Sequence, residues 1–195
     1  MATSQGLVIL DRDGVINQDS DNYVKSLSEW HPYPSAIDAI ARLTKAGWVV
    51  AVATNQSGIA RGYLDVTVLE SMHRDLIRRV EAAGGKIAMI ASCPHGPDDH
   101  CSCRKPFPGM FLDIRDALGL DTLQGSWMVG DSLRDLQAGE AVGCYTVLVR
   151  TGKGEKTLAA GKGLEDANVF EDLAAFVSWL LNNPSQNYPE NHSLQ

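Results

Sequence analysis

Five short apolar runs, separated by stretches with helical spacing, constrain the fold of this chain more than any other feature. The two clearest are residues 7–10 and 48–53, which end abruptly at Asp11 and Thr54. Short runs that are apolar on both faces are typical of strands in a parallel sheet that is covered on each side. Three weaker runs follow the same pattern at residues 86–90, 127–129 and 145–149.

Apolar residues recur at helical spacing between and after these runs, for example at Ile37, Ile40 and Leu43. Strands that alternate with helices predict the α/β class, with a doubly wound parallel sheet. We expect a single domain over residues 1–182, followed by a polar C-terminal tail over residues 183–195. Residues 152–163 are rich in Gly and Lys and are predicted to form a loop.

The charge balance restricts the class of partner. Among 195 residues, 17 Lys and Arg face 24 Asp and Glu, which gives a net charge of −7. An acidic chain without a basic block is a poor general binder of nucleic acid or of anionic membranes. No apolar stretch is long enough to span a bilayer, and no secretory signal is visible at the N-terminus. We therefore expect a cytoplasmic protein that acts on a small molecule.

Polar side chains stand at the ends of three predicted strands, where α/β sheets bind their ligands. Asp11 and Asp13 follow the first run, and two neighbouring carboxylates can act as nucleophile and as general acid/base. Asp131 follows the fourth run and is suited to Mg²⁺, which prefers hard oxygen ligands. Asp135, one helical turn later, is expected to support the site. Taken alone, Asp11 to Gly14 could equally be a solvated turn.

Groups that could hold a phosphate lie in two other segments. Thr54 and the residues after it offer hydroxyl, amide and backbone N–H donors. Arg104 and Lys105 offer two cations in an acidic protein, and a phosphate beside carboxylates needs positive charge nearby. The alternative for this Arg-Lys pair is a solvated surface position.

A cluster of cysteines and one histidine indicates a second metal site. Cys93, His95, Cys101 and Cys103 match the ligands of a closed, tetrahedral structural zinc site. His100 is a rival ligand, and free or redox-active thiols in a loop are the alternative. In a cytosolic chain, such a cluster favours metal over disulfides. The remaining Cys144 is expected to be a small buried apolar residue.

The ordered motifs DRDG, TNQSG, RKP and GDS resemble those of the haloacid dehalogenase superfamily of phosphatases, over roughly residues 7–150. The resemblance implies a magnesium-dependent phosphatase with Asp11 as the nucleophile and Asp13 as the general acid/base. It also implies that Thr54 binds the transferred phosphoryl group and that Lys105 neutralises it. Asp11, Asp131 and the backbone carbonyl of Asp13 would hold Mg²⁺. The spacing of the motifs leaves no room for a separate cap domain.

Within the superfamily, the predicted zinc loop makes the chain most similar to the D-glycero-D-manno-heptose-1,7-bisphosphate 7-phosphatases. A histidinol-phosphate phosphatase or a broader sugar phosphatase is the alternative. The first family removes the C7 phosphate during synthesis of lipopolysaccharide heptose. The chain departs from that family in a loop at residues 18–23 that is one residue longer, and in Ser132, where many members have Lys. The resemblance implies a set of substrate-binding residues: Asp19, Asn22, Tyr23, Asn55, Gln56, Ser57 and Arg104.

Two readings from other classes have less support. A non-catalytic, zinc-stapled binding module would be expected to lack a catalytic residue, and none is missing. A polynucleotide 3′-phosphatase shares some of the motifs, but the net charge and the lack of a basic groove argue against it. We expect a monomer, because no long apolar helix face remains once the core is assigned.

Overall fold

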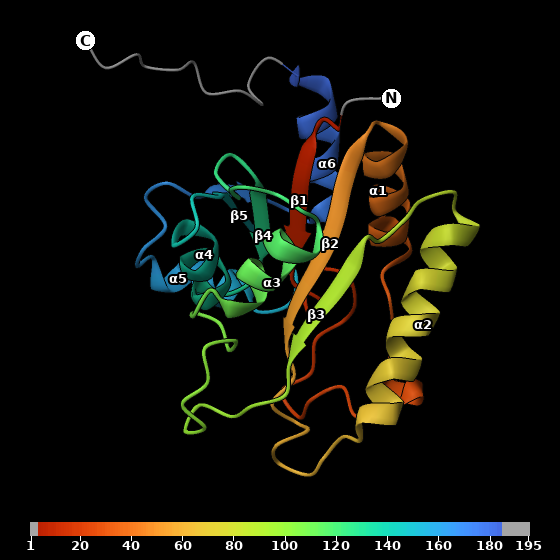
Figure 1. The fold of residues 1–195 in the computed structure, drawn as a ribbon, viewed down its shortest axis with the longest axis vertical. Coiled ribbons are helices and arrows are strands. Elements are labelled where there is room, and N and C mark those ends of the chain that lie inside the picture. The colour runs from red at the N-terminus through yellow and green to blue at the C-terminus, as the bar shows by residue number, and fades with distance from the viewer. Residues whose placement is uncertain (1–3, 185–195) are drawn as a thin grey trace.

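The computed structural model describes residues 4–184, and its centre is a six-stranded sheet in which every neighbouring pair is parallel. The strand order is β3-β2-β1-β4-β5-β6, the doubly wound order that the alternation of strands and helices predicted. Figure 1 shows this arrangement. The strands are β1 (Gly6–Leu10), β2 (Trp48–Asn55), β3 (Met89–Cys93), β4 (Trp127–Gly130), β5 (Tyr145–Val149) and β6 (Asn168–Phe170).

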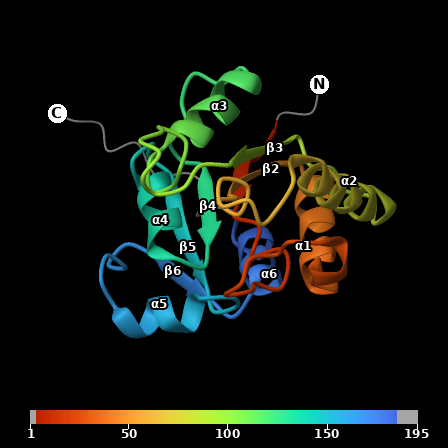
Figure 2. The same cartoon turned by 90° about the horizontal axis from the view of Figure 1, so that it is seen from below.

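Alternate residues of the strands enter two separate cores, one on each face of the sheet. Val8 and Leu10 pack with apolar side chains of α1 (Pro34–Lys45), α2 (Val66–Ala82) and α6 (Leu173–Asn182). Leu7 and Ile9 pack with α3 (Gly109–Ala117) and α4 (Leu133–Glu140) on the other face. The helices are seen on the two sides of the sheet in Figure 2. Burial on both faces explains why the central strands read as continuous apolar runs.

Three elements differ from the sequence-based expectations. The third strand is Met89–Cys93 rather than residues 86–90, because it pairs with β2 as far as Asn55. The expected loop over residues 152–163 contains a short helix, α5 (Gly154–Ala160). The three-residue edge strand β6 was not expected, since only pairing with β5 defines it. The predicted tail at residues 183–195 lies almost wholly outside the described residues.

The strand order places the candidate site. After β1, the chain adds β2 and β3 on one side and then returns to add β4 on the other side of β1. Ligands of doubly wound sheets bind at this switch point, beyond the carboxyl ends of the strands. Asp11 follows β1 there, and Asp131 follows β4. Within residues 4–184, no additional sheet or helical layer caps this edge, as the motif spacing predicted.

Among the same residues, none of the helices combines the length and the apolarity needed to cross a lipid bilayer.

Candidate active site

Lys105 lies at the bottom of the site and joins two carboxylates. Its Nζ is 2.9 Å from Asp11 Oδ1 and 2.8 Å from Asp135 Oδ1, and it donates to the carbonyl oxygen of Ala53 at 2.7 Å. The side chain is 1% exposed, so it is not the solvated cation that the sequence left as an alternative. A buried ammonium with three oxygen partners keeps its charge, and its pKa is raised because the carboxylates outweigh the cost of burial.

Both carboxylate oxygens of Asp135 have partners within the site. Its Oδ2 accepts from the backbone N–H groups of Asp131 and Ser132 and from the Ser132 hydroxyl. The bond from the Ser132 N–H belongs to the capping box at the start of α4. With Oδ1 paired to Lys105, the carboxylate of Asp135 is fully engaged, as expected of an orienting residue.

The carboxylate of Asp131 fits between two glycines from distant segments. A Cβ atom at Gly14 or at Gly152 would collide with Asp131 Oδ2, and both glycines have positive φ, +88° and +58°. Asp131 Oδ2 also accepts the backbone N–H of Lys153 at 2.9 Å. Gly14 therefore does more than allow a sharp turn, because it makes room for the third acidic group of the site.

The acidic groups fit a divalent cation. Asp11, Asp131 and Asp135 each place one carboxylate oxygen within 4.8 Å of the others. Burial first, then the charges of neighbouring carboxylates, raise the pKa of Asp11 to about 7 and that of Asp131 to about 9. Lys105 is paired with Asp11 and Asp135, whereas the carboxylate of Asp131 accepts only the Lys153 backbone N–H among the contacts of the described residues. A hard dication would relieve this repulsion.

Asp13 has a different environment. Its Oδ1 accepts from Arg12 Nε at 2.9 Å and from the Asn17 amide at 2.9 Å, while its Oδ2 accepts from Gln56 Nε2 at 3.0 Å. Burial opposes ionisation, but the Arg12 charge and these donors outweigh it and hold the pKa of Asp13 below its ordinary value. The pKa of Asp11 is thus raised and that of Asp13 is lowered. Two neighbouring carboxylates with opposite pKa shifts are typical of an acid/base pair with separate roles.

Residues at the end of β2 and just after it bind other residues of the site, in addition to lining the cavity. The side-chain amide of Asn55 binds the backbone of Lys105 at both N–H and C=O. Gln56 Nε2 donates to the Thr54 hydroxyl at 2.9 Å as well as to Asp13. Thr54 is 1% exposed and lies behind Gln56, outside the set of residues that line the cavity.

A polar cavity of about 230 Å³ opens over these groups. Most of the expected substrate-binding residues line it, namely Asp19, Tyr23, Asn55, Gln56, Ser57 and Arg104. Asn22 does not; it is exposed, and its carbonyl oxygen accepts from Lys25 Nζ. Tyr23 has a positive φ of 65° and packs against Tyr63.

Sequence reasoning missed four cations near the cavity. Arg61, Arg134 and Lys153 line it, and Arg12 lies directly behind Asp13. Arg134 is two residues beyond Ser132, the position where the family's Lys is absent. Isolated Arg and Lys residues carry no sequence pattern that distinguishes them from solvated surface charges, so only the tertiary arrangement revealed them.

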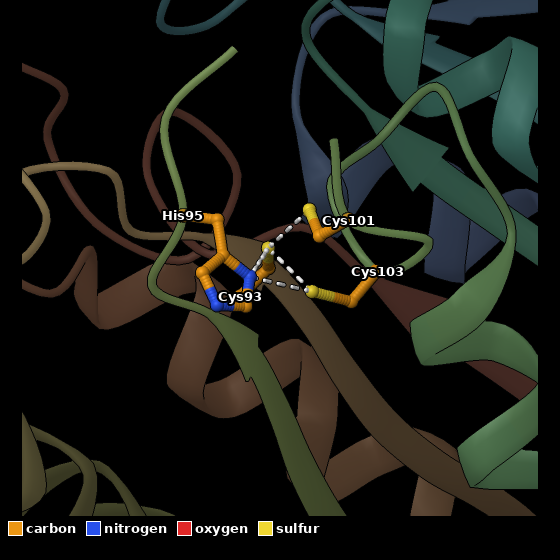
Figure 3. Close-up of side chains that lie close together, drawn as sticks. All are labelled: Cys93, His95, Cys101 and Cys103. Atoms are coloured by element: carbon orange, nitrogen blue, oxygen red, sulfur yellow. Dashed lines mark hydrogen bonds between the residues drawn. The ribbon is translucent and has the colours of Figure 1, made fainter. Parts of the chain in front are cut away.

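The zinc loop brings its four predicted ligands together, as Figure 3 shows. His95 Nδ1 lies 3.6 Å from Cys93 Sγ and 3.3 Å from Cys103 Sγ, and the sulfur atoms of Cys93 and Cys101 are 3.7 Å apart. His100 is outside this cluster. Three thiols and one imidazole in such an array fit a closed zinc site. Cys144 is a buried free thiol, as expected.

The loop reaches the cavity through Arg104, which follows Cys103 directly. Its guanidinium donates to the His95 carbonyl oxygen at 3.2 Å, so a residue of the Cys/His cluster holds it in place. Arg104 and Arg134 both line the cavity. Burial first, and then the nearby charge of Arg134, lower the pKa of Arg104.

Comparison with known proteins agrees with this geometry. The family model described as HAD-hydrolase-like matches residues 102–176. A D-glycero-β-D-manno-heptose-1,7-bisphosphate 7-phosphatase of Pseudomonas aeruginosa is 60% identical over 179 residues, which covers 91% of this chain and 99% of the relative. The enzyme of the same name from Bordetella bronchiseptica is 54% identical over 90% of this chain and 97% of the relative.

A solved structure leads to the same family. The crystal structure of the D,D-heptose 1,7-bisphosphate phosphatase of B. bronchiseptica, complexed with magnesium and phosphate, has a TM-score of 0.87 at 53% identity. The match covers 91% of this chain and 99% of that chain. With near-complete coverage at this identity, the chain belongs to the D-glycero-β-D-manno-heptose-1,7-bisphosphate 7-phosphatase family of the haloacid dehalogenase superfamily.

Proposed function

We propose that this enzyme hydrolyses the C7 phosphate of D-glycero-β-D-manno-heptose 1,7-bisphosphate through a phosphorylated aspartate at Asp11. The observation that carries the proposal is that Asp11, Asp13, Lys105 and Asp131 meet at one cavity. The chain also shares 60% identity with a relative that bears this name. The β anomer is taken from the names of the relatives.

In the first step, an Asp11 carboxylate oxygen attacks the phosphorus and the bond to the C7 oxygen breaks. Lys105 is 2.9 Å from Asp11 and faces the cavity, so it can stabilise the charge that shifts onto the phosphoryl group. Asp13 gives a proton to the leaving alkoxide. Because Arg12 favours the ionised form of Asp13, the approaching phosphate has to raise the pKa of this carboxyl group by like-charge repulsion.

In the second step, water attacks the phosphorus of the phosphorylated Asp11. The ionised Asp13 accepts a proton from that water, inorganic phosphate leaves, and the Asp11 carboxylate is regenerated. The environment of Asp13 suits this step directly, because three side-chain donors stabilise its charged form. We assign Thr54, behind Gln56, to binding the transferred phosphoryl group.

The donor set suits Mg²⁺, held by Asp11, Asp131 and the backbone carbonyl of Asp13. When bound, the ion supplies positive charge to the phosphoryl oxygens. A structural Zn²⁺ at Cys93, His95, Cys101 and Cys103 has a separate role, since four protein ligands leave no open position for substrate.

A second phosphate on the substrate suits the cation-rich wall of the cavity. Arg104 and Arg134 repel each other in the absence of an anion. A phosphate at C1 would remove that repulsion and could accept charge-assisted hydrogen bonds from both guanidinium groups. We infer that Arg134 supplies the positive charge that Ser132 does not.

We further propose that the protein works in the cytoplasm as a monomer. The free thiols of the zinc loop suit a reducing compartment. Light scattering coupled to gel filtration measures the oligomeric state, and a mass of twice 21.1 kDa or more would contradict the monomer.

Phosphate release tests the function directly. Both anomers of the heptose bisphosphate and histidinol phosphate should be compared with Mg²⁺ present. We expect a preference for the β anomer, with C7 as the position cleaved. Preference for histidinol phosphate, or equal rates on all monoesters, would remove the heptose assignment. In the same assay Asp11→Asn should abolish turnover with the fold intact, and near-normal turnover would refute the nucleophile.

A further inference from the structure

Arg12 is a fully buried cation whose charge acts on Asp13 but which the proposed steps do not bring into contact with substrate. Its side chain is 0% exposed and it is absent from the residues that line the cavity. Burying a guanidinium is costly unless its charge and its donors are satisfied. The contacts of Arg12 therefore indicate what this position is built to hold.

One side of the guanidinium faces Asp13. Nε donates to Asp13 Oδ1 at 2.9 Å, and the terminal Nη2 lies 2.8 Å from the same oxygen. Asp13 itself is 21% exposed and lines the cavity. Arg12 thus contacts the Asp13 carboxylate from the protein interior, while Asp13 itself borders the cavity.

The other side of the guanidinium is fixed by α2 and by the loop before α1. Nη1 lies 3.2 Å from His73 Nε2, and the Arg12 Cζ atom is 5.0 Å from the centre of the Trp30 ring. Trp30 is held in turn, because its indole N–H donates to Asp75 at 2.9 Å. A ring face against a desolvated guanidinium is a favourable contact that also sets its plane.

His73 can act in this set only as an acceptor. Arg12 has donors and no acceptor, so the Nε2 atom that faces it must be unprotonated. Burial first, then the Arg12 charge, lower the pKa of His73 to about 4, in agreement with a neutral ring. The N–H of that ring is then at Nδ1.

We infer that Arg12 is a positioning residue, which His73 and Trp30 fix in place so that it orients the Asp13 carboxylate for proton transfer to the leaving oxygen. The inference rests on the proposed role of Asp13 as acid and base. It goes beyond that role by assigning Arg12, which contacts this carboxylate, and His73 and Trp30, which hold Arg12 in place. None of the three touches the substrate cavity.

Comparing kcat/KM on an alkyl phosphate and on an aryl phosphate distinguishes a role in proton transfer from a role in stability alone. An alkyl phosphate such as the heptose bisphosphate needs a proton on its leaving oxygen, whereas p-nitrophenyl phosphate releases a stable phenolate. The ratio kcat/KM includes only steps up to phosphoryl transfer, so it reports the acid step. For Arg12→Lys we expect about 10²-fold loss of kcat/KM on the alkyl substrate and less than about threefold on the aryl one.

Variants of His73 test the second layer of contacts. His73→Leu removes the acceptor. It should lower kcat/KM on the alkyl substrate, by less than Arg12→Lys does, and leave kcat/KM on the aryl substrate nearly unchanged. His73→Gln keeps an acceptor and should retain most of the kcat/KM on the alkyl substrate. Arg42→Lys is the matched control, because Arg42 is partly buried on α1 and bonds to Ser178, away from the cavity. It should change neither substrate's kcat/KM.

A double-mutant cycle on the heptose substrate gives the decisive comparison. If Arg12 acts through Asp13, Arg12→Lys should cost almost nothing further in an Asp13→Ala background. An unchanged cost in that background, or equal losses on the alkyl and aryl substrates, would overturn the inference. Failure of the proposed function would look different, since the unaltered enzyme would then not release the C7 phosphate. Thermal unfolding and zinc content establish that each variant is folded.

Discussion

Asn55 binds the backbone of Lys105 at both of its polar groups, with Oδ1 accepting the N–H at 3.0 Å and Nδ2 donating to the carbonyl oxygen at 3.2 Å. One residue at the end of β2 thereby fixes the cation that pairs with Asp11, the proposed nucleophile. The two residues are 50 positions apart in the sequence. The amide therefore joins the second strand to the segment that follows the zinc loop.

Asn55→Ala should remove both bonds and leave the Lys105 backbone poorly held. Buried hydrogen bonds contribute about 1 kcal/mol each, so we expect a loss of about 2 kcal/mol in the free energy of unfolding. We also expect kcat to fall at least about tenfold, because a misplaced cation stabilises the transition state less well. Urea unfolding and steady-state kinetics measure the two effects. Asn182→Ala, at the exposed end of α6, is the control, and equal behaviour of the two variants would contradict this role.

Gly14→Ala should damage the metal site while the sheet remains intact. The added methyl group would meet the Asp131 carboxylate, and the φ of +88° is strained for any L-residue. We expect Mg²⁺ affinity to fall by at least about tenfold, which calorimetric titration measures. Gly62→Ala controls for backbone strain alone, since its φ is also positive but nothing lies within 4 Å of the new atom. Unchanged Mg²⁺ binding in Gly14→Ala would show that the carboxylate can move.

Mg²⁺ binding should be coupled to proton release. In the metal-free enzyme, the pKa of Asp131 is raised to about 9 by burial and by the charges of Asp11 and Asp135. At pH 7.5 this carboxyl group therefore holds a proton that the ion must displace. Below pH 9, the apparent affinity should rise by up to about tenfold per pH unit. Calorimetry in buffers of different ionisation enthalpy counts the protons, and a value of zero would contradict a protonated Asp131.

Loss of zinc should affect both stability and substrate binding. Cys103→Ser removes one of the four ligands and, through the loop, the support of Arg104 by His95. We expect the bound zinc to fall from about one per chain, the thermal midpoint to drop, and KM for the bisphosphate to rise. Elemental analysis, calorimetry and kinetics measure these. Cys144→Ser is the matched control, because Cys144 is a buried free thiol outside the Cys/His cluster. Full zinc content in Cys103→Ser would exclude this cysteine as a ligand.

The sequence by itself determined most of the sheet, because strands buried on both faces are apolar along their length. Four strands, β1, β2, β4 and β5, appear as such runs, and the run at residues 86–90 begins three residues before β3. The sequence also determined the order in which Asp11, Thr54 and Asp131 reach one edge, since parallel strands place their carboxyl ends together. The Cys/His cluster was also readable from the sequence, because soft donors at short spacing have few other uses.

The tertiary structure decided what depends on contacts between distant segments. The β6 edge strand is defined only by its pairing with β5, and the short α5 helix replaced an expected loop. Only the folded chain shows that Asn55 holds Lys105, and that Arg12 stands behind Asp13. Such contacts join side chains far apart in the chain, and their geometry and burial, rather than residue type, determine the charge and orientation of each group.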